Sequence, residues 1–351
     1  MASHPASSAA AFRVLVVDDS IVARAVLTRL IDATGRFLVT GTAGTVGAAL
    51  DYLRREQVDL ILLDLALPGV DGLTGLPDLI AAGGNAKVLI VSTSAAAGAS
   101  ASVSALALGA ADTLEKPDSS GMSANFGRML VERLDRLVAR PILPPEGSGN
   151  VVMPPPAAGE DFDVVAIGAS TGGIHALGGL LRALPATFRL PILVTQHLPV
   201  SFMPYFAAQL AVLSGRPCEV ASDRLRVRSG RIMVAPGDAH LRCVRIGPRE
   251  AAIRLCHEPA ASGCMPSVDP MLASVADVFG SRTLAVVLSG MGRDGAEGAR
   301  LVHEAGGTVV VQDRETSVVW GMPAAVVAQG FAAATLPPEE LGRLVASRRR
   351  P

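Results

Sequence analysis

A serine, a histidine and an aspartate each come after an apolar run that is typical of a buried strand. Ser170 lies in VVAIGASTGG (164–173), His197 follows PILVTQ, and Asp294 lies in the glycine loop after ALAVVLS. A hydroxyl nucleophile, a base with a pKa near neutral and a carboxylate that fixes the tautomer of that base are the groups that acyl transfer requires. These three residues therefore predict a hydrolytic site, provided that their strands lie side by side.

The glycine-rich turn also has interpretations that involve no acyl transfer. Backbone N–H groups at a helix start bind phosphate, but the turn lacks the GK[ST] of a P-loop and the GxGxxG spacing of dinucleotide sites. Ser170 and Asp294 are also candidate helix N-caps, and His197 is a candidate structural residue. The order Ser, His, Asp further differs from the Ser, Asp, His order of α/β-hydrolases. Spacing alone leaves these alternatives open.

A second group of reactive side chains follows the strands expected in the first third of the chain. Asp18 and Asp19 follow the first strand, Asp64 the third, Ser92 the fourth and Lys116 the fifth. Clustered carboxylates repel one another unless a divalent cation joins them, and Mg²⁺ prefers oxygen ligands. We therefore expect Asp18, Asp19 and Asp64 to bind Mg²⁺. With Asp64 as nucleophile and Lys116 as charge partner, the group is suited to accepting a phosphoryl group.

A regular alternation of strand and helix patterns must position this second group. In residues 12–140 we expect five β/α units, with strands at 13–17, 37–41, 60–63, 87–91 and 110–114. Half of all residues are hydrophobic and only 3% are aromatic, which suits strands buried on both faces of a parallel sheet. The pattern predicts a doubly wound, flavodoxin-like α/β domain.

Residues 141–160 are rich in proline and lack periodicity, which is typical of an extended linker between domains. A second α/β domain with a parallel sheet is expected over 161–348, with strands at 192–195, 284–288 and 308–311 among others. Short strand candidates at 231–234, 241–246 and 251–255 predict an antiparallel excursion from it. Because the carboxyl ends of parallel strands meet at one edge, this domain would bring the serine, histidine and aspartate together.

Residues 12–140 resemble a response-regulator receiver domain through VVDDS, LLDLALPGVDG, IVST and a late Lys–Pro pair. The resemblance implies that a histidine kinase phosphorylates Asp64 and that Ser92 and Lys116 form the receiver switch. One position departs from the pattern, since Thr113 stands where receivers often carry an aromatic residue. We therefore expect the phosphorylation signal to be transmitted more weakly or by another route.

Six motifs that occur in order across residues 163–335 resemble those of the chemotaxis methylesterase family, CheB: IGASTGG, TQHLP, VAPGDAH, PSVDPML, LSGMGRDGA and SVVWGMPAA. In that family the substrates are glutamate γ-methyl esters on methyl-accepting chemoreceptors, and some members also deamidate glutamine. The resemblance makes Ser170 the nucleophile, His197 the general base and acid, and Asp294 the orienting carboxylate. The Met291 backbone N–H, with groups near Thr171, would stabilise the oxyanion. A phosphorylation-regulated enzyme of chemotaxis adaptation is implied, without a cofactor in this domain.

Charge and hydropathy argue against several other classes of protein. The formal net charge of −1 offers no basic surface for nucleic acid, and no helix-turn-helix pattern follows the linker. No apolar run reaches the roughly 18 residues of a spanning helix, and the N-terminus lacks a signal-peptide pattern. We therefore expect no membrane insertion and a cytoplasmic location. A dinucleotide-dependent oxidoreductase and a binding module with an inert triad remain as alternatives.

The four cysteines show no CxxC spacing. Cys256, His257 and Cys264 lie close in sequence, but their spacing fits no common zinc pattern. We therefore expect reduced, structural thiols. Among the remaining histidines, His240 in the PGDAH turn is the one candidate for lining the hydrolytic site.

Overall fold

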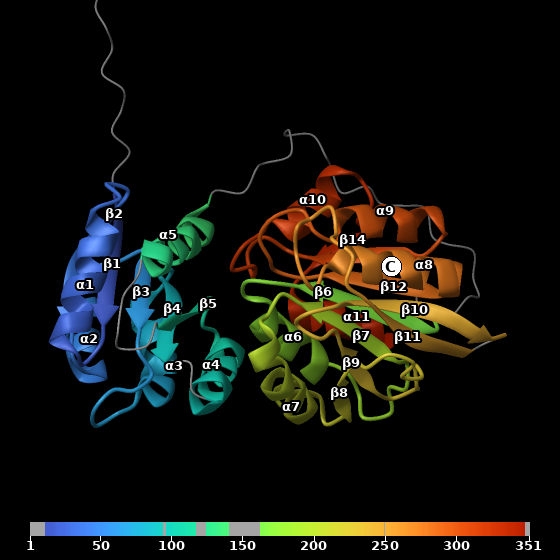
Figure 1. The fold of residues 1–351 in the computed structure, drawn as a ribbon, viewed down its shortest axis with the longest axis horizontal. Coiled ribbons are helices and arrows are strands. Elements are labelled where there is room, and N and C mark those ends of the chain that lie inside the picture. Colours follow the sequence, from blue (N-terminus) through green and yellow to red (C-terminus); the bar gives the residue numbers. More distant parts are fainter. Residues whose placement is uncertain (1–10, 94–95, 117–123, 140–161, 249, 348–351) are drawn as a thin grey trace, which may run out of the picture. The chain divides into compact units, whose positions relative to one another are not determined.

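A computed structural model of the chain describes residues 11–93, 96–116, 124–139, 162–248 and 250–347 (Figure 1). The chain divides into two compact units, Met1–Val138 and Ala139–Pro351. The linker expected over 141–160 lies outside the described residues, so the domain boundaries at 140 and 161 stay predictions. Within the described residues, no helix is both long enough and apolar enough to cross a bilayer.

The first unit is built on a five-stranded sheet in which every neighbouring pair is parallel. The strands in sheet order are β2 (Phe37–Ala43), β1 (Phe12–Val17), β3 (Leu60–Leu63), β4 (Lys87–Thr93) and β5 (Asp112–Lys116). The helices are α1 (Ile21–Asp32), α2 (Val46–Leu53), α3 (Gly72–Gly83), α4 (Ala96–Leu108) and α5 (Ala124–Val138). The predicted doubly wound domain is confirmed.

Side-chain caps begin three of these helices at the end of the loops that leave the sheet. Ser20, Thr45 and Asp71 each accept a hydrogen bond from the backbone N–H three residues further on, at the start of α1, α2 and α3. Such caps satisfy N–H groups that would otherwise lack partners. They therefore fix where each helix starts and how long the loop before it is.

The second unit contains a seven-stranded sheet, also parallel throughout. Its strands in sheet order are β14 (Ala334–Leu336), β13 (Thr308–Gln312), β12 (Thr283–Val287), β6 (Val164–Ala169), β7 (Ile192–Gln196), β9 (Ile232–Val234) and β8 (Cys218–Val220). Its helices are α6 (Gly173–Arg182), α7 (Met203–Ser214), α8 (Val268–Phe279), α9 (Ala296–Glu304), α10 (Met322–Ala328) and α11 (Pro338–Ser347), with 3₁₀ turns η1 (Val200–Phe202) and η2 (Gly280–Arg282). The predicted parallel-sheet α/β class is confirmed.

The antiparallel excursion is smaller than we expected. Strands β10 (His240–Gly247) and β11 (Glu250–Cys256) do form an antiparallel pair, which packs on α8. The candidate at 231–234 does not belong to it, and that part of the prediction is wrong. It forms β9, which pairs in parallel with both β7 and β8. All three β9 residues are buried, so its apolar side chains suit the interior of the main sheet.

Helices cover both faces of the seven-stranded sheet (Figure 1). One core cluster joins alternate residues of the central strands, such as Val164 and Ala166 of β6, to Met271 and Val275 of α8 and Ala299 of α9. On the opposite face, α6 packs against both α7 and α11. The three strands β12, β6 and β7 are neighbours, so the loops at their carboxyl ends lie next to one another.

Candidate active site

The three predicted triad residues meet at the carboxyl ends of β6, β7 and β12. Ser170 follows β6 directly, and its backbone N–H donates to the Ser289 carbonyl (3.0 Å). The His197 N–H donates to the Ala169 carbonyl (3.2 Å), which fixes the end of β7 beside the serine. His197 Nδ1 lies 3.1 Å from Ser170 Oγ, and Nε2 lies 2.7 Å from Asp294 Oδ2. A continuous hydrogen-bonded chain therefore links hydroxyl, imidazole and carboxylate.

The turn after Ser170 depends on glycine. Gly172 has a φ of +75° and is the N-cap of α6, and a Cβ there would lie 2.5 Å from Cβ of Val318. A left-handed backbone in so small a space favours glycine. No side chain caps α6, so the alternative in which Ser170 serves as its N-cap is wrong. The Ser170 hydroxyl faces His197 instead.

Five hydrogen-bond donors hold the Asp294 carboxylate. Oδ1 accepts from Ser267 Oγ (2.7 Å), Asp269 N (3.2 Å) and Gly295 N (3.0 Å). Oδ2 accepts from Val268 N (2.8 Å) and from His197 Nε2. Burial raises the pKa of Asp294, but the bonds from His197, Val268 and Ser267 outweigh it and lower the pKa to about 2. The carboxylate therefore stays ionised and fixed in orientation at neutral pH.

The sequence alone did not indicate three of these donors, which come from Ser267, Val268 and Asp269. They lie in the PSVDPML motif, to which the pattern assigns no individual roles. His240 holds the segment that contains Ser267 in place, because its Nδ1 accepts from the Ser267 backbone N–H (2.8 Å). Its Nε2 then donates to the Glu258 carbonyl (2.8 Å). His240 is only 1% exposed, so it supports the site from the interior and does not line it.

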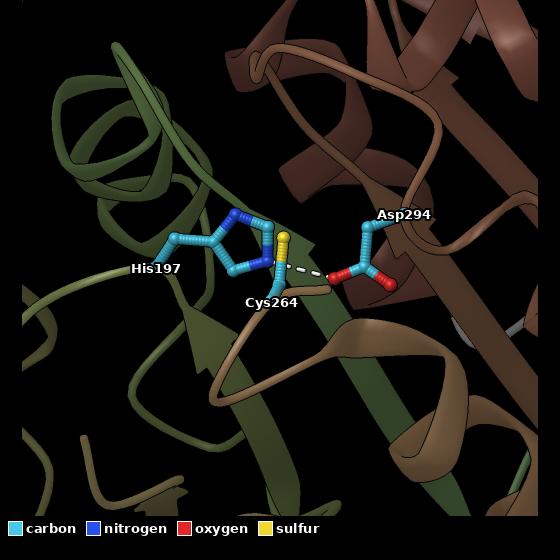
Figure 2. Close-up of side chains that lie close together, drawn as sticks. All are labelled: His197, Cys264 and Asp294. Atoms are coloured by element: carbon cyan, nitrogen blue, oxygen red, sulfur yellow. Dashed lines mark hydrogen bonds and ion pairs between the residues drawn. The ribbon is translucent and has the colours of Figure 1, made fainter. Parts of the chain in front are cut away.

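His197 is a stronger base than we expected. Burial lowers its pKa, but the hydrogen bond to Asp294 and the neighbouring Cys264 side chain outweigh burial and raise the pKa to about 9. Figure 2 shows the Cys264 sulfur close to the imidazole edge that faces Asp294. With Asp294 ionised, the neutral ring carries its proton on Nε2, which leaves Nδ1 as the acceptor for the serine proton.

The loop that contains Met291 lies against Ser170. A Cβ at Gly290 would come within 2.8 Å of the Ser170 Cβ, so this close approach requires glycine. The SVVWGMP motif fixes the loop, because the Gly290 carbonyl accepts from the N–H groups of Gly321 (3.0 Å) and Met322 (2.8 Å). Backbone N–H groups next to a nucleophile are the donors that an oxyanion hole needs. The predicted position of Met291 is compatible with that role.

The first unit brings Lys116 together with the three predicted acidic residues. Lys116 Nζ donates to Asp18 Oδ2 (2.7 Å) and to Asp64 Oδ2 (2.6 Å). Burial lowers the pKa of Lys116, but these two bonds outweigh it, so the pKa lies above its ordinary value. Asp18 and Asp64 are buried and Asp19 is exposed, and one carboxylate oxygen from each lies within 4.8 Å of the others. This all-oxygen cluster fits Mg²⁺.

Ser92, the predicted switch serine, forms a hydrogen bond to a helix of its own unit. It is buried, and its Oγ lies 2.9 Å from Ser102 Oγ of α4. Thr113, which replaces the usual aromatic residue, is half-buried on β5. The Ser92 hydroxyl has to break its hydrogen bond to Ser102 before it can reach a group on Asp64.

These two sites define the class of protein. The first unit holds an acidic cluster with a lysine that would suit a phosphoryl acceptor, and the second holds a serine, a histidine and an aspartate arranged as a serine hydrolase requires. The description "Response regulator receiver domain" matches residues 14–123, and "CheB methylesterase" matches residues 165–345. The chain belongs to the CheB methylesterase family and carries a receiver domain before the catalytic part.

Relatives of known name agree over almost the whole chain. A protein-glutamate methylesterase/protein-glutamine glutaminase 1 from Paramagnetospirillum magneticum is 37% identical, with 96% of this chain and 96% of the relative covered. Protein-glutamate methylesterase/protein-glutamine glutaminase 2 from Caulobacter vibrioides is 38% identical, with 96% and 99% covered. The crystal structure of the Thermotoga maritima CheB methylesterase catalytic domain is 36% identical, covers 54% of this chain and 99% of its own, and has a TM-score of 0.51.

Proposed function

We propose that this chain hydrolyses glutamate γ-methyl esters on methyl-accepting chemoreceptors, under control of phosphorylation at Asp64, in chemotaxis adaptation. The observation that carries the proposal is the hydrogen-bonded chain from Ser170 through His197 to Asp294. The names of the relatives support the substrate class and extend it to glutamine side-chain amides. We place this activity in the cytoplasm, where a histidine kinase would supply the phosphoryl group.

The first half of the reaction acylates Ser170. His197 Nδ1 takes the proton from Ser170 Oγ, and that oxygen attacks the ester carbonyl carbon. The backbone N–H of Met291, with donors near Thr171, holds the oxyanion. The C–O bond to the methyl group's oxygen then breaks, and methanol leaves with the proton from Nδ1. Asp294 stabilises the imidazolium that exists between these two proton transfers.

The second half releases the glutamate carboxylate. Water attacks the acyl carbon while His197 Nδ1 removes its proton. The bond to Ser170 Oγ breaks, and the serine oxygen recovers the proton from His197. An amide substrate follows the same steps with ammonia as the leaving group, so one site serves both activities in the relatives' names.

Control resides in the first unit. Asp64 Oδ2 is the candidate phosphoryl acceptor, and Lys116 is positioned to balance the added charge. Mg²⁺ held by Asp18, Asp19 and Asp64 would neutralise negative charge on the phosphoryl group. A change in receiver conformation on phosphorylation, with two states a few kcal/mol apart, is enough to control the esterase.

Methanol release from methylated chemoreceptors tests the proposal. Wild type and Ser170→Ala are compared with and without a small-molecule phosphodonor. We expect release by wild type, faster release with phosphodonor, and none above background by Ser170→Ala. Equal release by the two proteins would contradict the assignment of Ser170.

A further inference from the structure

A thiol stands beside the two triad residues that are not the nucleophile. One donor atom from each of His197, Cys264 and Asp294 lies within 4.8 Å of the others. The thiol comes from the loop before α8, the imidazole from the end of β7 and the carboxylate from the loop before α9 (Figure 2). We propose that these three side chains form a binding site for a thiophilic divalent cation of the zinc type, and that occupancy of this site inhibits the esterase.

The donor set favours Zn²⁺ over hard cations. Sulfur, imidazole nitrogen and carboxylate oxygen are the three ligand types that zinc takes in proteins, at about 2.0–2.3 Å, usually with four ligands in a tetrahedron. Mg²⁺ and Ca²⁺ prefer oxygen ligands. Three protein ligands leave one position for water, as in many zinc centres with an open site. His197 Nε2 and Asp294 Oδ2, now 2.7 Å apart, need to separate only slightly to admit the ion.

The surroundings already orient these ligands. Ser267 Oγ and the N–H groups of Val268 and Asp269 hold the carboxylate in place. Hydrogen bonds of this kind to a ligating carboxylate strengthen metal sites. The side chain of His197 is 17% exposed and Cys264 is half-buried, so an ion can reach the cluster from solvent. Cys243, by contrast, is buried and belongs to no such cluster among the described residues.

Zinc would inhibit the esterase because it changes which imidazole nitrogen of His197 carries the proton. A cation on Nε2 needs the lone pair of that nitrogen, so the neutral ring must carry its proton on Nδ1. Nδ1 lies 3.1 Å from Ser170 Oγ and then donates to the serine instead of accepting from it. The ring can no longer remove the serine proton. Zinc would thus be an inhibitor and not a cofactor of the esterase.

Zinc binding can be measured without any esterase activity. Full-length Ser170→Ala is titrated with Zn²⁺ against a chromogenic chelator, in excess Mg²⁺ so that Mg²⁺ fills the acidic cluster of the first unit. The same titration is done on the double variants that add Cys264→Ser or Cys256→Ser. We expect one tight zinc site per chain, weakened at least roughly 10-fold by Cys264→Ser and unchanged by Cys256→Ser. Equal affinity with and without the Cys264 thiol would overturn the site.

The inhibition rests on the proposed function and is measured separately. Methanol release by wild type, Cys264→Ser and Cys256→Ser is followed over a range of Zn²⁺ concentrations, each relative to its own zinc-free rate. We expect wild type and Cys256→Ser to be inhibited together and Cys264→Ser to need at least roughly 10-fold more zinc. A protein that binds zinc at Cys264 but keeps its full rate would refute the inhibition. Absence of methanol release from every protein would refute the proposed function and leave the binding result standing.

Discussion

Asp64 and Asp294 are both buried carboxylates at the carboxyl ends of parallel strands, yet different groups balance their charge. Asp64 shares a single lysine ammonium with Asp18. Asp294 accepts from four groups of its own surroundings, three of them backbone N–H groups, and from one imidazole. A lysine side chain can move when another charged group arrives, whereas backbone donors are fixed.

The comparison shows how one topology serves two chemistries. The cluster around Asp64 has charge partners that can rearrange, which suits a site that gains a phosphoryl group and a cation. The setting of Asp294 is complete before substrate arrives, which suits a carboxylate whose task is to orient a base. Four changes to the protein or to its solution test this contrast.

Replacing Asp294 by asparagine should lower kcat for the methyl ester about 10⁴-fold with little change in KM. Asparagine keeps the shape, but its amide can donate to the imidazole and favour the wrong tautomer. Steady-state methanol release measures the effect, and Asp277→Asn on the exposed side of α8 is the matched control. A large rise in KM at constant kcat would instead assign Asp294 to substrate binding.

The esterase rate should rise with pH across the neutral range. His197 must be neutral to accept the serine proton, and its pKa is raised to about 9. The neutral fraction grows with pH below that value, so kcat/KM should increase roughly 50-fold between pH 7 and pH 9. Ser170→Ala measured at each pH gives the background of alkaline ester hydrolysis. A rate that is flat over this range would show that free His197 is already neutral at pH 7.

Asp64→Ala should abolish the response to phosphodonor while weak esterase activity persists. We expect stimulation of wild type by about 5- to 150-fold, the range of ordinary coupling free energies. The variant lacks the acceptor oxygen but leaves the second unit unchanged. Methanol release with and without phosphodonor measures the response, with Asp51→Ala at an exposed position of α2 as control. A variant as inducible as wild type would refute control through Asp64.

Ser267→Ala should lower the esterase rate about 10-fold, because a hydrogen bond to a charged group contributes about 1.5 kcal/mol or more. The Ser267 hydroxyl donates to Asp294 Oδ1 at 2.7 Å and is fully buried. Ser274→Ala removes another buried hydroxyl, from the α8 helix that Ser267 precedes, without touching Asp294. The rates of both variants show whether the loss comes from the bond to Asp294 or from a less stable fold. An equal loss in both variants would attribute the effect to general stability.

Strand ends could be predicted from the sequence because parallel sheets obey a simple rule. Buried strands read as apolar runs, and their carboxyl ends meet at one edge. That rule alone predicts that Ser170 lies near His197 and that Asp64 lies near Lys116. The rule could not assign β9 to the parallel sheet, because a strand of three residues shows no pattern that distinguishes parallel from antiparallel pairing.

Loop contacts could not be predicted in the same way. Cys264 and Ser267 lie in a segment without hydrophobic periodicity. Tertiary packing, which no local pattern encodes, brings this segment next to the ends of β7 and β12. The spacing of Cys256, His257 and Cys264 pointed to no site, because the partners of Cys264 are about 70 and 30 residues away in sequence. Likewise, nothing in IVST indicated that Ser92 would bond to Ser102 of α4.

Mass-spectrometric mapping of covalent adducts can locate the acylated and the phosphorylated residue in one sample. The full-length protein is mixed with a slowly deacylating ester substrate and a phosphodonor, quenched in acid during turnover, and digested. We predict an acyl group on Ser170 and a phosphoryl group on Asp64 in the same sample, with no acyl group in Ser170→Ala. An acyl adduct on Cys264, or turnover with no adduct on Ser170, would contradict the account.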